Sequence, residues 1–423
     1  METLNKIWAI RELRFKILVV AGLLLMTRVL AHIPLPGVDP STLSAFFQQN
    51  QVLGLLDMFS GGTMSQFSII LMGVGPYITS SIIFQLLVMV IPSLEELQKE
   101  GESGQNKINQ YTRLATVPLA VIQSYSMLAL LKSQGIIPGW GGFELAVMLI
   151  TSTAGTMLLM WLGEIISEKS VGNGISLIIT IGILSSVPQS ASNTWALMQS
   201  GDISKIIGAI VFVLILVIVV AAIIFITEGQ RNIPVSYARR SSNAVVAKSE
   251  SHLPIRVNIA GVIPIIFAMS ILVVPGVIGK YLELAKTEWI KSGATYVVNL
   301  FQNNVFYGIV YFLLVFLFTF FYTYVVFKPE QISENLQRQG GFIPGLRPGT
   351  ETRQFLSKVV TRITFVGGLF LAMIAVLPYI VQAVTNINTI VLGGTGILIV
   401  VAVVIESMKQ IDAQILMHTY DSY

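Results

Sequence analysis

The sequence contains no cysteine and few charged side chains. Of its 423 residues none is Cys and only 11% are Asp, Glu, Lys or Arg, whereas 54% are hydrophobic. The absence of cysteine excludes disulfides, thiolate metal ligands and cysteine nucleophiles. A soluble globular protein carries about 25% charged residues, so this chain is too poor in charge to be surrounded by water along its whole length. The composition indicates an integral membrane protein.

Histidine is also scarce, and the common catalytic motifs are missing. The three histidines, His32, His252 and His418, are far apart in the sequence, and none belongs to an HExxH motif. No GxxxxGK[ST] phosphate loop is present, and we find no Ser/His pair or pair of carboxylates typical of an intramembrane protease. These absences predict a chain that is not an enzyme and holds neither a metal ion nor a cofactor.

Long apolar segments alternate with polar ones along the chain. A transmembrane helix requires about 20 mostly apolar residues, and ten segments approach that requirement. The predicted fold class is therefore an all-α membrane protein with ten transmembrane helices. The candidate spans are 17–34, 68–91, 114–132, 144–163, 175–190, 205–227, 258–279, 305–327, 361–382 and 390–406.

The basic residues are unequally distributed between the two sides of this arrangement. If the N-terminus is cytoplasmic, 20 of the 26 Lys and Arg residues lie in the cytoplasmic connections and at the two ends, and 5 lie on the opposite side. Because cytoplasmic loops carry an excess of Lys and Arg, both termini are predicted to be cytoplasmic. Two cytoplasmic connections, 228–257 and 328–360, are long and basic, and loops of that length usually bind a partner or are disordered.

One charged residue lies inside a predicted span. Arg28, together with the HIPLPG sequence that follows, favours a retained first helix over a cleavable signal peptide. We expect Arg28 to reach an interface or to pair with another helix. Carboxylates are rare within the spans, since Glu164 and Glu406 lie at span ends. Ion-coupled transporters usually need intramembrane carboxylates, so an ion-coupled secondary transporter of a small solute is the weaker alternative.

The second predicted span is unusual because it is rich in Gly, Pro and small polar residues. Gly73, Gly75, Pro76 and Thr79 all lie within it. Small residues in membrane helices commonly serve close helix packing. Irregular and polar backbone at membrane depth is tolerated only where protein or water covers it. For the segment as a whole we therefore favour a helix that lines a polar or gated interior.

Seven segments, in order along the chain, carry the motifs of one known family. Two of them are SIILMGVGPYITSSIIFQ (68–85) and WLGEIISEKSVGNGISLII (161–179). The other five are DMFSGGTMS (57–65), EGESGQNKINQYTR (100–113), SHLPIRVNIAGVIP (251–264), GFIPGLRPGTET (341–352) and GGTGILIVV (393–401). These segments, distributed over nearly the whole chain, resemble the SecY family of channel-forming translocase subunits. The first two are similar to the two family signatures, except that Ser170 stands where the family usually has Gly.

This resemblance implies a protein-conducting channel with two pseudo-symmetric halves, an inverted repeat, around a central hourglass pore. The halves would be 1–190 and 205–423, joined by a hinge loop at 191–204. Unfolded secretory polypeptides would cross the bacterial plasma membrane through the pore. Membrane segments would leave sideways into lipid between the second and seventh spans. The implied partners are the SecE and SecG subunits, the SecA ATPase motor, the ribosome, signal peptides with unfolded preproteins, and membrane lipid.

The resemblance also assigns roles to individual residues. An apolar ring closes such a pore because it excludes water and so blocks ions. Without the family, the same aliphatic residues would be read as packing or lipid-facing residues, and the basic ones as determinants of orientation. The implied pore ring is Val74, Ile78, Ile175, Ile179, Ile266 and Ile399. The implied plug, near 55–66, includes Leu55, Asp57, Phe59, Gly61, Gly62 and Ser65. The implied lateral gate includes Thr79, Gln123 and Ser270, and the implied SecA or ribosome docking residues are Arg239, Arg240, Lys248 and Arg347.

Overall fold

The described part of the chain is mostly helical and divides into two compact units. The computed structural model describes residues 8, 10–35, 43, 47, 57, 60–136, 141–199, 203–237, 251–282, 287–385 and 394–421. The first unit consists of Met1–Ala196, Val273–Gln302 and Val403–Tyr423, and the second of Leu197–Leu272 and Asn303–Ala402. Three of the four boundaries between the units fall within helices, and the fourth falls between the helices that end at Gln302 and begin at Asn304.

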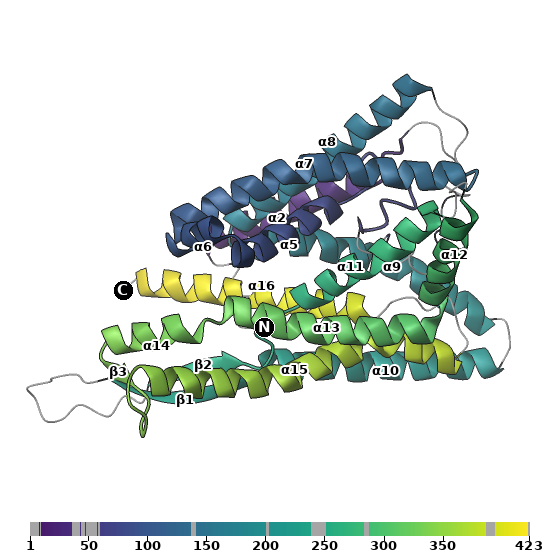
Figure 1. Ribbon diagram of the computed structural model, residues 1–423. Helices are drawn as coiled ribbons and strands as arrows, with labels where there is room; N and C mark the ends of the chain where they lie inside the picture. Colours follow the sequence, from purple (N-terminus) through teal and green to yellow (C-terminus); the bar gives the residue numbers. More distant parts are fainter. Residues whose placement is uncertain are drawn as a thin grey trace, which may run out of the picture. The chain divides into compact units, whose positions relative to one another are not determined.

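In the first unit, α5 packs against α7 and α7 packs against α8, while α2 also contacts α8 (Figure 1). The helices that lie wholly or mainly in this unit are α2 (Arg11–Ala31), α5 (Gly75–Val90), α6 (Pro92–Lys99), α7 (Glu102–Ser133), α8 (Gly142–Glu168), α9 (Gly174–Gln199), α12 (Glu288–Gln302) and α16 (Gly394–Asp421).

The second predicted span differs from the structure at its start. We expected a helix over 68–91, but α5 begins at Gly75 and the preceding residues form turns. Gly73 has a positive φ of 54°, which only glycine adopts without steric cost, and Pro76 occupies the first turn, where its missing N–H is not needed. At the other end, the chain bends by 99° between α5 and α6.

A hydrophobic core fixes the segment that precedes α5. Phe67, Leu71 and Met72 are buried against the C-terminal half of α7, through Leu128 and Leu131. These contacts hold the irregular segment by side-chain packing rather than by regular secondary structure.

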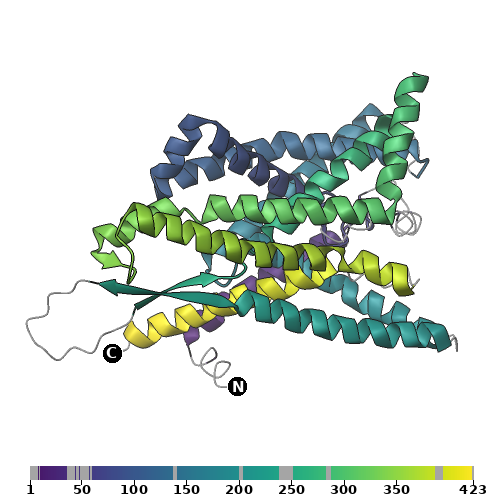
Figure 2. The same ribbon diagram turned by 60° about the horizontal axis from the view of Figure 1, so that its bottom comes forward.

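In the second unit, two long helices, α13 (Asn304–Val326) and α15 (Thr350–Thr385), run side by side (Figures 1 and 2). The unit also contains α10 (Ile203–Glu228), α14 (Pro329–Arg338) and the first part of α11 (Ile263–Leu282). The sequence predicts a hinge loop at 191–204, but in the structure α9 continues to Gln199 and α10 begins at Ile203. Little of that segment is therefore a loop.

A small antiparallel sheet is built from the two long basic connections, with two strands in 228–257 and one in 328–360, where the sequence predicts loops. β1 (Gln230–Tyr237) pairs with β2 (Ser251–Arg256) and with the short β3 (Gly341–Phe342), in the order β2-β1-β3 (Figure 2). Ile233 and Ile255 of the sheet are buried with Leu356 of α15 in one core. The hairpin is therefore anchored to a long helix by apolar contacts.

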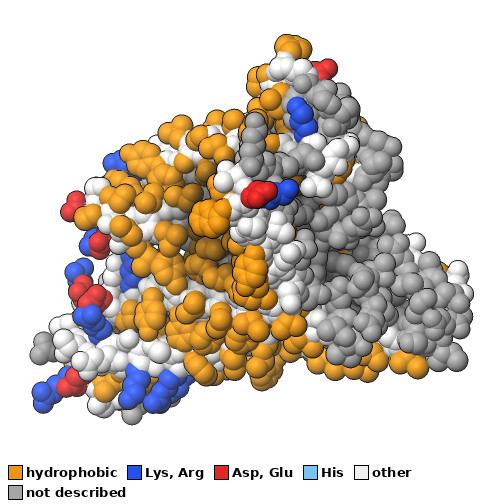
Figure 3. All heavy atoms as spheres, turned by 45° about the vertical axis from the view of Figure 1, so that its right-hand side comes forward, with side chains coloured by type: hydrophobic (Ala, Val, Ile, Leu, Met, Phe, Trp, Pro, Cys, Tyr) orange, Lys and Arg blue, Asp and Glu red, His pale blue; other side chains and the backbone are white. Residues whose placement is uncertain are grey.

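The surface of the described residues suits a lipid environment. Five helices are long and apolar enough to cross a membrane, or six if the bent pair α5 and α6 counts as one span, and the described part holds two shorter apolar helices besides. Large apolar side chains lie outside in both units, for example Leu25, Val217 and Leu317, which are 67%, 60% and 61% exposed. Figure 3 shows hydrophobic side chains over much of the face it presents. Such exposure is favourable only in an apolar solvent.

Candidate functional site

The described part of the candidate plug is tied together by its own hydrogen bonds. The Asp57 carboxylate accepts a bond of 2.8 Å from the Ser65 backbone N–H, and the Asp57 carbonyl accepts one of 2.8 Å from the Gly62 N–H. Burial raises the pKa of the Asp57 carboxyl, while the hydrogen bonds from Ser65 oppose that change. The side chain of Thr63 is buried and donates to the carbonyl of Leu71 at 3.2 Å. Two predicted plug residues, Leu55 and Phe59, lie outside the described residues.

A side chain from α2 contacts this plug segment. Both Nη atoms of Arg28 donate to the carbonyl oxygen of Gly61, at 3.1 and 3.2 Å, and Nη1 also donates to Oγ of Ser185 in α9 at 2.6 Å. The sequence predicts that Arg28 reaches an interface or pairs with another helix; it bonds to α9 and, in addition, to the plug segment. A lone cation inside an apolar span was the available signal.

Four predicted pore-ring residues lie at the starts of two helices in the first unit. Val74 is the residue before α5 and Ile78 lies one turn later, with the Ile78 N–H bonded to the Val74 carbonyl at 3.1 Å. Ile175 and Ile179 occupy the first turns of α9, and Ile175 lies against Gly163 of α8. Val74 and Ile179 are buried, and Ile78 and Ile175 are half-buried.

The other two predicted ring residues belong to the second unit. Ile266 is half-buried in α11, and Ile399 is fully buried in α16. All six ring residues are therefore described, and each is in or directly before a helix. The ring itself stays a prediction.

Two of the three predicted gate residues are hydrogen-bonded to each other. Gln123 of α7 donates through Nε2 to Oγ1 of Thr79 in α5 at 3.3 Å, and Thr79 donates to the Gly75 carbonyl at 3.0 Å. Ser270, in the second unit, donates to the Ile266 carbonyl at 2.9 Å. A single long bond between neutral side chains is weak, so the contact between Gln123 and Thr79 breaks at little cost.

The segment that resembles the second signature forms a tight turn between α8 and α9. Oγ of Ser167 donates to the Gly163 carbonyl at 2.9 Å and accepts from the Gly174 N–H at 2.9 Å. Ser170 has a φ of 56°, and its carbonyl accepts a bond of 2.6 Å from Nε2 of Gln414 in α16. The position where the resemblance expects Gly is thus one whose backbone favours Gly.

Of the four predicted docking residues, only Arg347 is described. Arg239, Arg240 and Lys248 lie outside the described residues. Arg347 is exposed at the turn before α15, and its backbone N–H donates to the Glu351 carboxylate at 3.1 Å while its carbonyl accepts from Thr352 Oγ1 at 3.0 Å. Hydrogen bonds of its neighbours therefore fix the backbone and leave the guanidinium exposed.

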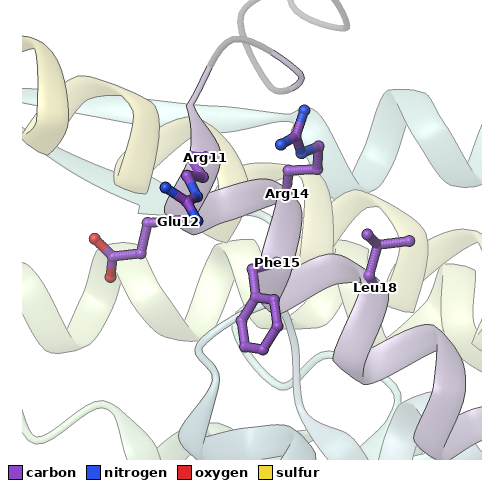
Figure 4. A pocket seen from close by; sticks show the side chains of 5 residues that line it. All are labelled: Arg11, Glu12, Arg14, Phe15 and Leu18. Carbon is purple, nitrogen blue, oxygen red and sulfur yellow. The ribbon is translucent and has the colours of Figure 1, made fainter.

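A separate hollow lies on the first turns of α2. It measures about 510 Å³ and is lined by Arg11, Glu12, Arg14, Phe15 and Leu18, all from this one helix (Figure 4). Among the described residues, none of the predicted pore, plug or gate residues lines it. Within the described residues, no group of three or more His, Asp or Glu side chains is placed to hold a metal ion.

Comparison with solved structures defines the fold. A structure described as a protein conducting channel matches 93% of this chain and 90% of its own, with a TM-score of 0.63 and 17% identity. Sec61 in a canine ribosome-channel complex from the endoplasmic reticulum matches the same shares, with a TM-score of 0.59 and 17% identity. The fold is therefore that of the protein-conducting membrane channels.

Sequence comparison identifies the family. The family model of SecY matches residues 68–408. The chain is 40% identical over 428 residues to the protein translocase subunit SecY of Pseudomonas aeruginosa, covering 99% of this chain and 93% of the relative. It is 38% identical over 421 residues to that of Escherichia coli, covering 97% and 94%. The chain belongs to the SecY family, and its function is that of a protein-conducting channel subunit in a membrane translocase. No comparison supports the alternative of a small-solute transporter.

Proposed function

We propose that this chain conducts unfolded secretory polypeptides across the bacterial inner membrane and releases apolar segments sideways into lipid. The observation that carries this proposal is the sequence identity of 40%, over 99% of the chain, to a protein translocase subunit. The N- and C-termini are cytoplasmic in this proposal, as the excess of basic residues on that side indicates.

The pore closes on a ring of branched aliphatic side chains in the resting channel. Such side chains form no directed bonds, so they close around any passing polypeptide, and an apolar constriction excludes water and ions. The ring consists of Val74, Ile78, Ile175, Ile179, Ile266 and Ile399. The lateral gate lies between α5 and α11, and its polar residues are Thr79, Gln123 and Ser270.

The energy for transport comes from partners. No phosphate loop is present in the sequence, so we assign ATP hydrolysis to the SecA motor and synthesis-coupled transport to the ribosome. SecE and SecG complete the membrane complex. The long basic connections dock these cytoplasmic partners, and Arg347 is a contact residue because its exposed guanidinium offers a planar set of donors for carboxylate or phosphate groups.

A reconstituted translocation reaction tests the proposal. Proteoliposomes with this chain, SecE and SecG receive a secretory precursor, SecA and ATP, and protection of the precursor from added protease is measured. Wild type should protect it only with ATP. Arg347→Glu should lower the protected fraction by about tenfold or more, because it reverses the charge of a contact. Arg347→Lys should also lower it, since a lysine lacks the planar fork.

The matched control is Arg14→Glu, at an exposed arginine of α2 that lies outside the two long basic connections and should leave the protected fraction unchanged. Equal protection in Arg347→Glu and wild type would remove Arg347 as a contact and leave the channel. If the folded wild type gave no ATP-dependent protection, the conducting role itself would be wrong.

A further inference from the structure

Glycine allows the plug segment to approach α2 and α9 very closely at one point. Gly61 has a φ of 82°, and a Cβ added to it would lie 2.8 Å from Nη2 of Arg28 and 3.0 Å from Cα of Gly182 in α9. A Cβ added to Gly182 would lie 2.6 Å from Cα of Gly61. Real Cβ atoms do not sit that close, so a side chain at either position would push the segment away from α9. Because Gly61 has no side chain, the Arg28 guanidinium can reach the Gly61 carbonyl oxygen directly.

The Arg28 guanidinium depends on this close approach for two of its three hydrogen bonds. A cation inside an apolar span is costly unless polar groups satisfy it. In the part of the chain that the structure describes, no carboxylate forms an ion pair with Arg28, and this side chain is half-buried. Two of its three hydrogen bonds end on the Gly61 carbonyl. Displacing the plug segment would thus leave a partly buried cation with one acceptor, the hydroxyl of Ser185.

The acceptors are neutral, and this makes the contact reversible. A buried ion pair that loses one partner leaves an uncompensated charge on both sides. Here the plug segment would leave only a carbonyl, which water satisfies in an open funnel. The charge therefore favours the closed arrangement without locking it.

We infer that Arg28 is a positioning residue that clamps the plug segment, at Gly61, to α9 in the resting channel. The inference rests on the proposed channel function and adds to it the contact whose release lets the plug move. Ser185 orients the guanidinium from the α9 side, and Gly61 and Gly182 supply the space.

The test uses the absence of native cysteine in this chain. Thr63→Cys places a single thiol at a buried plug position, and its alkylation by a membrane-impermeant maleimide is timed in proteoliposomes that contain the full complex without precursor. Potassium efflux from the same vesicles is the second readout. When Arg28→Gln is added to Thr63→Cys, the alkylation rate should rise by about tenfold or more over Thr63→Cys alone, because charge-assisted hydrogen bonds are lost. Potassium efflux should rise as well.

Two further variants separate a clamp from a general loss of structure. Arg14→Gln changes an exposed arginine of the same helix and should leave both rates unchanged. Ser185→Ala removes one of the three bonds and should give rates between wild type and Arg28→Gln. If Arg28→Gln does not assemble, Arg28→Lys takes its place, because it keeps the charge and cannot bond to both acceptors in the same geometry.

The outcomes are distinguishable from failure of the channel proposal. Faster alkylation and efflux in the Arg28 and Ser185 variants, with Arg14→Gln unchanged, would support the clamp. Rates equal to wild type in all Arg28 and Ser185 variants would overturn it. Because neither readout requires a precursor, a wild type that translocates nothing would contradict the channel proposal while the clamp is still measured.

Discussion

At the scale of single residues, the informative positions are those with an unusual backbone conformation or an unexpected charge. Ser170 is one of only two described non-glycine residues with a positive φ, the other being Phe67. The left-handed region costs an ordinary residue about 1–2 kcal/mol. The structure thus gives a physical reason for the family preference for Gly at this position, which the sequence alone presents only as a departure.

Ser170→Gly should stabilise the protein. The change relieves the left-handed conformation, and part of that gain is offset by the larger entropy of Gly in the unfolded chain, so the expected net effect is about 0.5–1 kcal/mol. The bond from Gln414 is kept, because it ends on the backbone carbonyl. The measurement is thermal unfolding in detergent, followed by the fluorescence of the 5 tryptophans.

Ser167→Gly provides the comparison in the same turn. It removes a side chain that bonds both Gly163 and Gly174, so the melting temperature should fall. A fall for Ser170→Gly as well would show that the conformation of Ser170 carries no strain.

At the scale of elements, close approach of backbones decides which helices pack. A Cβ added to Gly155 of α8 would lie 2.3 Å from the carbonyl oxygen of Ile69 and 3.0 Å from Cα of Ile70. The segment before α5 thus rests directly on the backbone of α8. Membrane helices have little hydrophobic drive to associate with one another, so small residues at such contacts carry much of the packing.

Gly155→Ala should lower the stability of the first unit by about 1–3 kcal/mol, because the atoms that the new Cβ would meet belong to the backbone of Ile69 and Ile70 and cannot rotate away. The control is Gly22→Ala in α2, where an added Cβ would meet nothing within 4 Å. That variant should keep or slightly raise the melting temperature. Equal melting temperatures for the two variants would contradict a backbone contact at Gly155.

At the scale of the whole molecule, the charge distribution predicts orientation. Counted over the ten predicted spans, 20 Lys and Arg residues fall on one side and 5 on the other. That bias holds a membrane protein in one orientation because translocation of basic loops is disfavoured. The prediction concerns the chain as a unit, since one missed span would exchange the sides of every later connection.

Single cysteines report the orientation directly. Thr350→Cys at the start of α15 and Ser292→Cys in α12 are both at exposed positions, and the chain holds no other thiol. An impermeant maleimide should label Ser292→Cys in intact cells and Thr350→Cys only in inverted vesicles. Labelling of Thr350→Cys from outside the cell would reverse the proposed topology.

Composition and motif order alone determined the membrane environment, the helical fold class and the family. These properties follow from hydropathy and local pattern, which each segment carries by itself. The tertiary structure decided where α5 begins, that the connection at 228–257 contains a hairpin, and that Arg28 bonds the carbonyl of Gly61. Proline is uncommon inside strands, yet β1 contains Pro234, and the strand pairs with β2 and is buried against α15. A contact between residues 33 positions apart depends on how helices pack, and no local pattern encodes that.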